Sequence, residues 1–205
     1  MVANAAQSTD VTLLRPPRRD VTRGRICAAA REVFLRSGYG AATLEHIALE
    51  AGLRRSTLYN HFRDKGEILA AIADDYLGAV TGVIGRLPPR PSRRQIDYWI
   101  DEFAEFVLVE RAPTLLFVSV TAANDAPPSI HQFGERLMTL FAGRVPAFAE
   151  ALQPGQERAF ARALAVLREL GWALCYHVEH EGRDLSPYKL EVAADLLEQF
   201  VKGWF

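Results

Sequence analysis

The sequence has only two cysteines, Cys27 and Cys175, among 205 residues. They lie far apart in segments with helical patterns, which favours buried thiols in a reducing compartment over a disulfide framework. No run of 18 apolar residues is present, and this excludes a membrane-spanning helix. The first ten residues lack both a basic segment and an apolar stretch of signal-peptide length. We therefore expect a cytoplasmic protein without a membrane partner.

Sequence patterns of common enzymes are also missing. The chain has no Gly-rich phosphate loop, no Gly-x-Ser-x-Gly, no His-Glu-x-x-His and no Cys/His metal framework. His177 and His180 stand three residues apart with acidic neighbours, but a third metal ligand is not evident. We therefore expect neither a metal nor a cofactor, and nothing in these patterns favours an enzyme.

Positive charge is unevenly distributed along the chain. Hydrophobic residues make up 49% and charged residues 24%, which is typical of a globular protein and excludes bulk disorder. The net charge is −1, yet residues 12–65 hold eleven lysines and arginines against five acidic residues. A basic N-terminal segment on an acidic remainder is typical of a unit that binds a polyanion. A solvated arginine-rich face is the alternative.

Apolar residues recur with helical spacing through most of the chain, and no segment alternates as a strand would. The fold is therefore predicted to be all-α. The expected helices cover residues 21–36, 64–85, 96–107, 114–123, 129–151 and 157–180, with a last helix after Ser186. Asp20 and Ser186 are predicted helix caps, Pro113 a first helical residue and Pro146 a kink. The three prolines of residues 87–92 predict a rigid connector.

Residues 43–62 contain the most informative motif. Thr43 is predicted to cap a short helix, and Gly52 to end it in the left-handed conformation. Leu58 and Phe62 are predicted to face inward on a second short helix, which gives helix-turn-helix geometry. The outward face of that helix carries groups suited to phosphates and base edges. These groups belong to Arg55, Ser56, Thr57, Tyr59, Asn60 and His61.

The same motif, with the segment Thr57-Leu58-Tyr59-Asn60-His61-Phe62 and the following Lys65, resembles the TetR family of bacterial transcriptional regulators. The resemblance covers about a quarter of the chain, roughly residues 20–70. It implies an N-terminal three-helix helix-turn-helix DNA-binding domain, joined by a long helix to a C-terminal helical-bundle effector and dimerisation domain. The corresponding boundaries are a flexible basic arm over 1–19, the DNA-binding domain over 20–66, and the ligand-binding and dimerisation domain over 67–205.

The resemblance also implies roles for single residues. The predicted DNA-binding residues are Thr43, Arg54, Arg55, Ser56, Thr57, Tyr59, Asn60, His61 and Lys65. Arg55 is expected to read a guanine, because a guanidinium can bond O6 and N7 together, and Lys65 to neutralise a phosphate. Arg54 stands where the family commonly has a capping serine. Because arginine cannot cap, we expect the helix to start at Ser56 or to be ordered by DNA.

Residues 15–19 form a basic arm that would enter a minor groove, and a disordered tail is the alternative. The second domain is rich in aromatic residues, most of which we expect in the core. The resemblance implies a pocket there for a small apolar or aromatic effector. The residues predicted to line it are Tyr98, Trp99, Phe103, Phe117, Phe141, Trp172 and Tyr176.

The last two helices favour a homodimer, because the helix over 157–180 has apolar residues on most of its surface. The residues predicted at the dimer interface are Phe160, Leu164, Leu167, Leu196 and Phe200. A monomeric core is the alternative. The expected function is therefore a homodimeric repressor that binds double-stranded DNA at a palindromic operator and is released by the effector. An activator, or a weakly specific DNA-binding protein without an effector, is the competing hypothesis.

Overall fold

The computed structural model describes residues 18–121 and 127–203 of the chain. Every regular element in these two ranges is an α-helix, which confirms the predicted fold class. The helices are α1 (Arg18–Ser37), α2 (Leu44–Glu50), α3 (Arg55–Tyr59), α4 (Lys65–Ile84), α5 (Arg93–Val109), α6 (Arg111–Thr121), α7 (Pro128–Ala142), α8 (Pro146–Ala151), α9 (Glu157–Glu179) and α10 (Ser186–Lys202). None of the helices in the described ranges combines the length and apolarity needed to cross a lipid bilayer.

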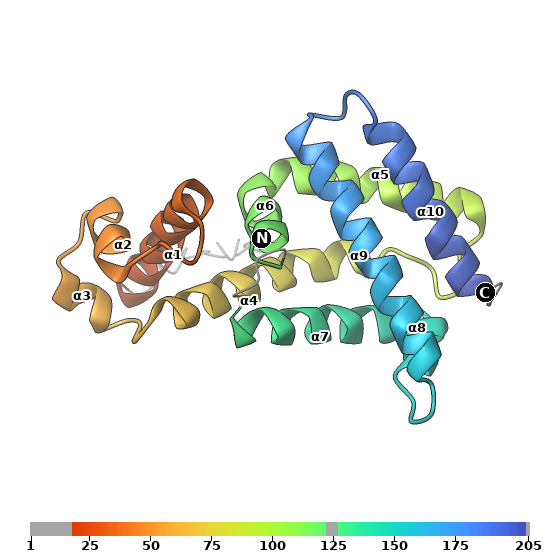
Figure 1. Ribbon diagram of the computed structural model, residues 1–205, viewed down its shortest axis with the longest axis horizontal. Coiled ribbons are helices and arrows are strands. Elements are labelled where there is room, and N and C mark those ends of the chain that lie inside the picture. Colours follow the sequence, from red (N-terminus) through yellow and green to blue (C-terminus); the bar gives the residue numbers. More distant parts are fainter. Residues whose placement is uncertain (1–17, 122–126, 204–205) are drawn as a thin grey trace, which may run out of the picture.

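The helices form a small head and a larger bundle that share α4 (Figure 1). The head consists of α1, α2, α3 and the first turns of α4, packed around buried side chains such as Ile26, Phe34 and Leu58. From there α4 extends into the bundle of α5 to α10. Helix α1 also packs against α6, so the head and the bundle touch at a second place.

Two side-chain hydrogen bonds hold the start of α4. The Asp64 carboxylate accepts a hydrogen bond from the Glu67 amide at 2.8 Å. The Glu67 carboxylate reaches back one residue further than a capping box requires and accepts from the Arg63 amide at 2.8 Å. The first bond satisfies an amide that the first helical turn leaves without a partner, and the second holds the residue before the N-cap.

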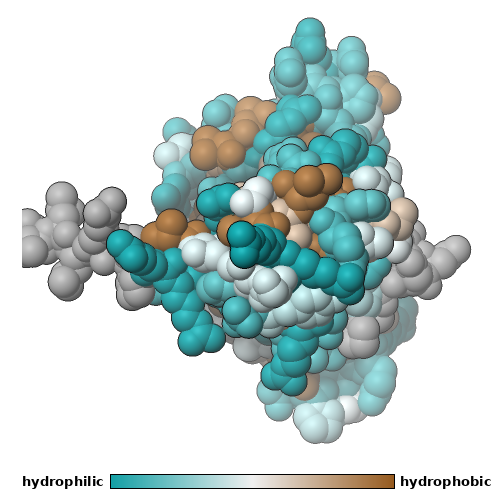
Figure 2. All heavy atoms as spheres, turned by 90° about the vertical axis from the view of Figure 1, so that its left-hand side faces the viewer, coloured by the Kyte–Doolittle hydropathy of each residue, from teal (hydrophilic) through white to brown (hydrophobic). Residues whose placement is uncertain are grey.

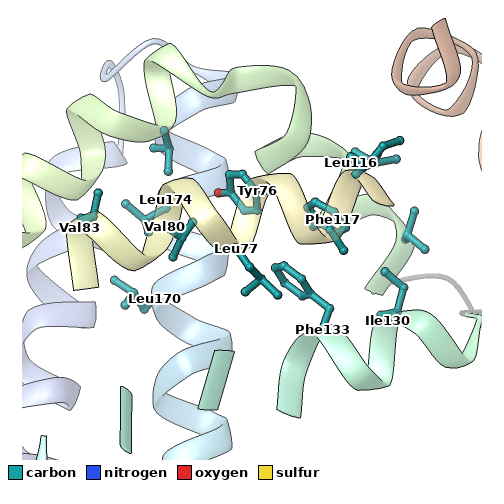
Figure 3. Packing of buried hydrophobic residues seen from close by; sticks show 14 of the residues in the cluster. Tyr76, Leu77, Val80, Val83, Leu116, Phe117, Ile130, Phe133, Leu170 and Leu174 are labelled. Carbon is teal, nitrogen blue, oxygen red and sulfur yellow. The ribbon is translucent and has the colours of Figure 1, made fainter. Parts of the chain in front are cut away.

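The core of the bundle surrounds the second half of α4 (Figure 3). Tyr76 and Leu77 of α4 face Phe117 of α6 and Phe133 of α7, while Leu174 approaches from α9. The Phe117 and Phe133 rings are stacked at 4.4 Å with an angle of 6° between their planes. Further along, Trp99 of α5 donates its indole N–H to the Val83 carbonyl at 2.9 Å.

The predicted roles of Asp20, Pro113, Pro146 and Ser186 at helix ends are wrong. Helix α1 begins at Arg18, so Asp20 lies in its first turn, where a carboxylate favours the helix dipole. Helix α6 begins two residues before Pro113, because proline is tolerated throughout a first turn that needs no amide donors. The chain breaks between α7 and α8 instead of kinking, because Pro146 requires an extended residue before it, and Val145 is extended. Ser186 is the first residue of α10 and follows its N-cap, Leu185.

Two further predictions concern residues outside the described ranges. Residues 1–17 of the predicted basic arm lie outside these ranges, whereas its Arg18 and Arg19 belong to the first turn of α1. The predicted break between the helices over 114–123 and 129–151 lies partly within residues 122–126. The connector over residues 87–92 is confirmed as non-helical, and Ser92 caps α5 in a capping box with Gln95.

Candidate nucleic-acid interface

The α2–α3 unit has the predicted helix-turn-helix geometry. Thr43 is extended at the N-cap of α2, and its hydroxyl accepts from the His46 amide at 3.2 Å. Gly52 has a φ of +60° after the end of α2, where a side chain would be strained. The Leu53 amide then donates to the Ala48 carbonyl at 2.9 Å and closes the turn. These features set the angle at which α3 leaves α2.

Helix α3 starts at Arg55, which corrects the expected start at Ser56. Among the described contacts, Arg54 makes no side-chain bond that caps the helix. Its carbonyl nevertheless accepts from the Thr57 and Leu58 amides at 2.9 and 3.2 Å. The fully buried Leu58 anchors the short helix to the head. Packing therefore holds the first turn in place without a side-chain cap.

Two arginines of α1 hold the turn and the far end of α3, and the sequence analysis did not predict either of them. Arg25 donates from Nε to the Ala51 carbonyl at 2.6 Å and from Nη2 to the Gly52 carbonyl at 3.0 Å. Arg23 lies over the Phe62 ring, with 4.2 Å between its guanidinium carbon and the ring centre. Because α1 precedes this motif by many residues, local spacing carries no signal of these contacts.

Lys65 lies where a cation was predicted, but its hydrogen bonds point into the chain. Its ammonium donates to the carbonyls of Tyr39, Gly40 and Ala42 at 2.7, 2.9 and 3.2 Å. An ammonium has three N–H donors, so these bonds match its full capacity. Lys65 therefore fastens the loop between α1 and α2 to the start of α4, and a phosphate contact would have to share these donors.

The remaining predicted DNA-binding residues gather on one end of the molecule, which Figure 2 views face on. Hydrophilic side chains surround several smaller hydrophobic patches on this face. Thr43, Arg54, Arg55, Ser56, Tyr59 and Asn60 are exposed, while Thr57 and His61 are half-buried. The outward face of α3 is therefore available to a partner.

Arg55 is held by two neighbours on this surface. Its Nη2 lies 2.7 Å from Oε1 of Glu45 and donates to the Tyr59 hydroxyl at 3.1 Å. The hydrogen bond with Tyr59, and then the charge of Glu45, raise the pKa of Arg55. A hydrogen bond from its own amide, and then the charge of Arg55, lower the pKa of Glu45. Glu45 was not among the predicted residues, because no sequence period relates it to Arg55 across the turn.

The seven predicted effector residues do not form one group. Trp99, Phe103, Phe117 and Phe141 are buried, and Trp99 lies 5.3 Å from Phe103 and 6.0 Å from Phe141 between ring centres. Phe117 instead belongs to the stack with Tyr76, whose ring centre is 5.4 Å away. Burial raises the pKa of Tyr76 to about 12, and its hydroxyl is hydrogen-bonded to that of Thr114 at 2.9 Å.

The other three predicted effector residues lie nearer the surface. Tyr98 is 66% exposed on α5 and Trp172 is 51% exposed on α9, so neither faces the core. Tyr176 is half-buried and stacks on His180, with 3.8 Å between ring centres. Tyr98 and Trp172 therefore face outward from their helices, away from the buried aromatic residues.

Two cavities open at other places. One of about 330 Å³ lies between α5, α9 and α10, and Asp97, Asp101 and His177 contribute to its lining. The second, of about 460 Å³, lies between the head and the α5–α6 corner, next to Arg25 and Pro113. None of the seven predicted effector residues lines either of these two cavities in the described chain.

His177 and His180 belong to no cluster that could hold a metal in the described ranges. Nδ1 of His177 is hydrogen-bonded to the buried Ser186 hydroxyl at 2.7 Å. Burial lowers the pKa of His177, against the opposite effect of nearby Glu105 and Asp101. The Ser186 hydroxyl therefore joins α9 to α10 and does not cap its own helix.

Helix α9 has two apolar faces, as the sequence predicts. One face packs into the bundle through Ala163, Val166 and Leu170. The other face is exposed: Phe160 is 38%, Leu164 44% and Trp172 51% accessible. The predicted interface residues Leu167 and Leu196 are half-buried beside it. The fifth, Phe200, is buried in its own chain, 4.7 Å from Phe148 between ring centres.

Known transcriptional regulators are similar in sequence to the N-terminal part of this chain. A family model described as "Bacterial regulatory proteins, tetR family" matches residues 26–72. The HTH-type transcriptional activator FasR of Mycolicibacterium smegmatis is 35% identical over 91 residues, 43% of this chain and 42% of FasR. The HTH-type transcriptional regulator SrpR of Pseudomonas putida is 49% identical over 51 residues, 25% of this chain and 24% of SrpR. The chain thus matches less than half the length of either relative.

A solved structure with the same fold covers nearly the whole chain. It is the transcriptional regulator FadR from Bacillus subtilis in complex with stearoyl-CoA, with a TM-score of 0.60 and 15% identity. The match covers 88% of this chain and 98% of that one. At this identity the likeness concerns the arrangement of the helices, both in the head and in the bundle.

Proposed function

This chain belongs to the TetR family of bacterial regulatory proteins, and we propose that it is a transcriptional regulator that binds double-stranded DNA through α2 and α3. The outward face of α3 carries this proposal. Arg55, Tyr59 and Asn60 are exposed together on a short helix, whose turn is fixed by the bonds of Arg25 to Ala51 and Gly52. A rigidly mounted polar helix with a guanidinium is suited to the major groove.

The regulator acts as a homodimer in this proposal. The exposed apolar face of α9, with Phe160, Leu164 and Trp172, would be covered by the same face of a second copy. Such pairing is isologous, so the two α3 helices are related by a two-fold axis. The operator is then a palindrome whose half-sites present successive major grooves to the two heads.

We further propose that a small apolar or aromatic effector acts on the bundle through α4. Tyr76, midway along α4, stacks with Phe117 and Phe133 from α6 and α7. An apolar molecule that entered among these rings would shift α4, and the bonds of Lys65 would carry the shift to the α1–α2 loop. The stearoyl-CoA bound to FadR, which has the same fold, supports this class of ligand. Repression with release by the effector follows if DNA and effector affinities oppose each other.

Activation of transcription is the competing hypothesis. We retain it because the relative FasR is named a transcriptional activator. A weakly specific DNA-binding protein without an effector is the other alternative. The sign of regulation depends on where the operator lies relative to a promoter, whereas sequence preference is a property of the chain itself.

Selection of bound sequences from random duplexes tests the proposal. Purified protein is used at two salt concentrations, because phosphate contacts alone give salt-sensitive binding. We expect an enriched palindrome that persists at the higher salt. An unenriched pool, or binding lost uniformly with salt, would contradict a sequence-specific regulator. Addition of long-chain acyl compounds to the complex with the enriched duplex then tests the effector. If none of them releases the duplex, long-chain acyl compounds are contradicted as the class of effector.

A further inference from the structure

Glu45 places a carboxylate on the surface that the proposed function turns toward DNA. It is exposed on α2, and its ion pair with Arg55 crosses the helix-turn-helix bend at 2.7 Å. A carboxylate here repels phosphates and so opposes binding to any duplex. An acidic residue beside the arginine predicted to read a guanine therefore has a role other than strengthening the binding of DNA in general.

The geometry of the pair limits what Arg55 can bind. Both contacts of the guanidinium, to Glu45 and to the Tyr59 hydroxyl, use Nη2. A guanidinium presents two parallel N–H groups either end-on, through Nη1 and Nη2, or side-on, through Nε and Nη2. Each of these arrangements needs Nη2. A two-pronged contact to DNA must therefore take one N–H of Nη2 from Glu45 or from Tyr59.

We propose that Glu45 is a specificity-determining residue, which withholds Arg55 from phosphates and leaves it available to a guanine. The inference rests on the proposed function. In the operator complex Arg55 keeps one N–H of Nη2 on Glu45 and moves the other from Tyr59 to the guanine. Nη1 completes the two-pronged contact to O6 and N7.

Charge balance distinguishes the two acceptors. The edge of a guanine is neutral, so the Glu45–Arg55 pair keeps one positive and one negative charge when Arg55 contacts it. A phosphate brings a second negative charge to the same guanidinium and lies against the Glu45 carboxylate. Glu45 therefore weakens binding to arbitrary duplexes more than binding to the operator, which is discrimination by repulsion of the wrong partner.

Glu50 provides a matched control on the same helix. Its carboxylate is also exposed and also pairs with an arginine, Arg36 of α1, at 2.8 Å. The two pairs thus share residue types and nearly the same length, but the Arg36–Glu50 pair does not involve α3. Glu45→Gln and Glu50→Gln each remove one negative charge and keep the side-chain size, so the net charge of the two variants is the same.

The experiment measures the affinity of the full-length protein and both variants for the selected operator and for a scrambled duplex, over a series of KCl concentrations. For Glu45→Gln we expect the operator-to-scrambled ratio to fall about tenfold, the scale of discrimination that one bidentate contact supplies. Most of the change should be tighter binding to the scrambled duplex, with a slope of log K against log salt steeper by about 0.9, or one phosphate. Glu50→Gln should keep the wild-type ratio.

A second arm repeats the substitution in an Arg55→Ala background. Because Glu45 acts through Arg55, the same substitution should then change the ratio by less than about twofold. An unchanged ratio in Glu45→Gln, or an equal fall in Glu50→Gln, would overturn the inference while wild-type selectivity still supported the proposed function. A wild-type protein without preference for any duplex would overturn both.

Discussion

The Lys65 ammonium lies 2.7 Å from the carbonyl oxygen of Tyr39 and 4.6 Å from the centre of the Tyr39 ring. Two more carbonyls, of Gly40 and Ala42, accept from the same nitrogen. The first residue of α4 thereby binds the loop that precedes α2. Because α4 continues to Tyr76 in the bundle, the loop and the aromatic stack are connected through one helix.

Replacing Lys65 should therefore destabilise the head even without DNA. Lys65→Met removes three hydrogen bonds from a charged donor, and we expect the free energy of unfolding to fall by about 1–3 kcal/mol. Urea unfolding measures this change. Arg63→Met is the control, since Arg63 is 90% exposed and pairs with Glu67 on the surface, and it should cost less than about 0.5 kcal/mol. Unchanged stability, with weaker binding to every duplex, would instead assign Lys65 to phosphate alone.

Two glycines should respond in opposite directions to alanine. At Gly52, φ is +60° and an added Cβ would meet Arg25 Nη2 at 3.0 Å, so Gly52→Ala should cost about 1 kcal/mol or more and weaken DNA binding. Gly24 is exposed within α1 with open space around it, and Gly24→Ala should stabilise by about 0.5–1 kcal/mol. Thermal unfolding compares the two. Equal effects of the two substitutions would show that the turn does not require the left-handed conformation.

The exposed face of α9 should control assembly. Leu164→Glu places a charge in the proposed dimer interface, and we expect monomers at concentrations where the wild type is dimeric, since an unpaired charge is costly to bury. Light scattering after size-exclusion chromatography measures the mass. Tyr98→Glu, at an exposed position of α5, is the matched control and should leave the dimer intact. Helicity by circular dichroism should remain that of the wild type in both variants, and a Leu164→Glu dimer would contradict the interface.

Acid should weaken the α9–α10 junction at His177. Burial lowers the pKa of this histidine below its ordinary 6.5, although Asp101 and Glu105 act in the opposite direction. The unfolded chain therefore binds a proton more readily, and the stability is lost as pH falls from 6.5 through the lower pKa of the folded state. His177→Gln cannot take up this proton and should give a shallower decline. Identical curves for the wild type and His177→Gln would contradict the burial effect.

Local patterns were enough to predict much of the fold and the frame of the site. Helical spacing predicted all-α structure, and Thr43, Gly52 and Asp64 act at the helix ends where their side-chain chemistry or conformational freedom places them. These features depend on residues only a few positions apart. The family resemblance added the interpretation of the α2–α3 unit as a DNA-binding motif.

Contacts between distant segments could not be predicted in the same way. Arg25 reaches Gly52 across the head, and Glu45 reaches Arg55 across a bend, so no period in the sequence relates them. The orientation of aromatic residues could not be predicted for a related reason. Helical spacing shows that Trp172 lies on an apolar face, but the face that packs inward is decided by the other helices.

The most direct test of the central claim compares the sequences selected by the wild type with those selected by Arg55→Ala. If α3 reads DNA through Arg55, the wild type selects a palindrome with a guanine at one position of each half-site. The variant then selects the same palindrome without a preference for any base at that position, because the bidentate contact is lost while the rest of the interface remains. An identical motif from both proteins, with the guanine retained, would contradict the account.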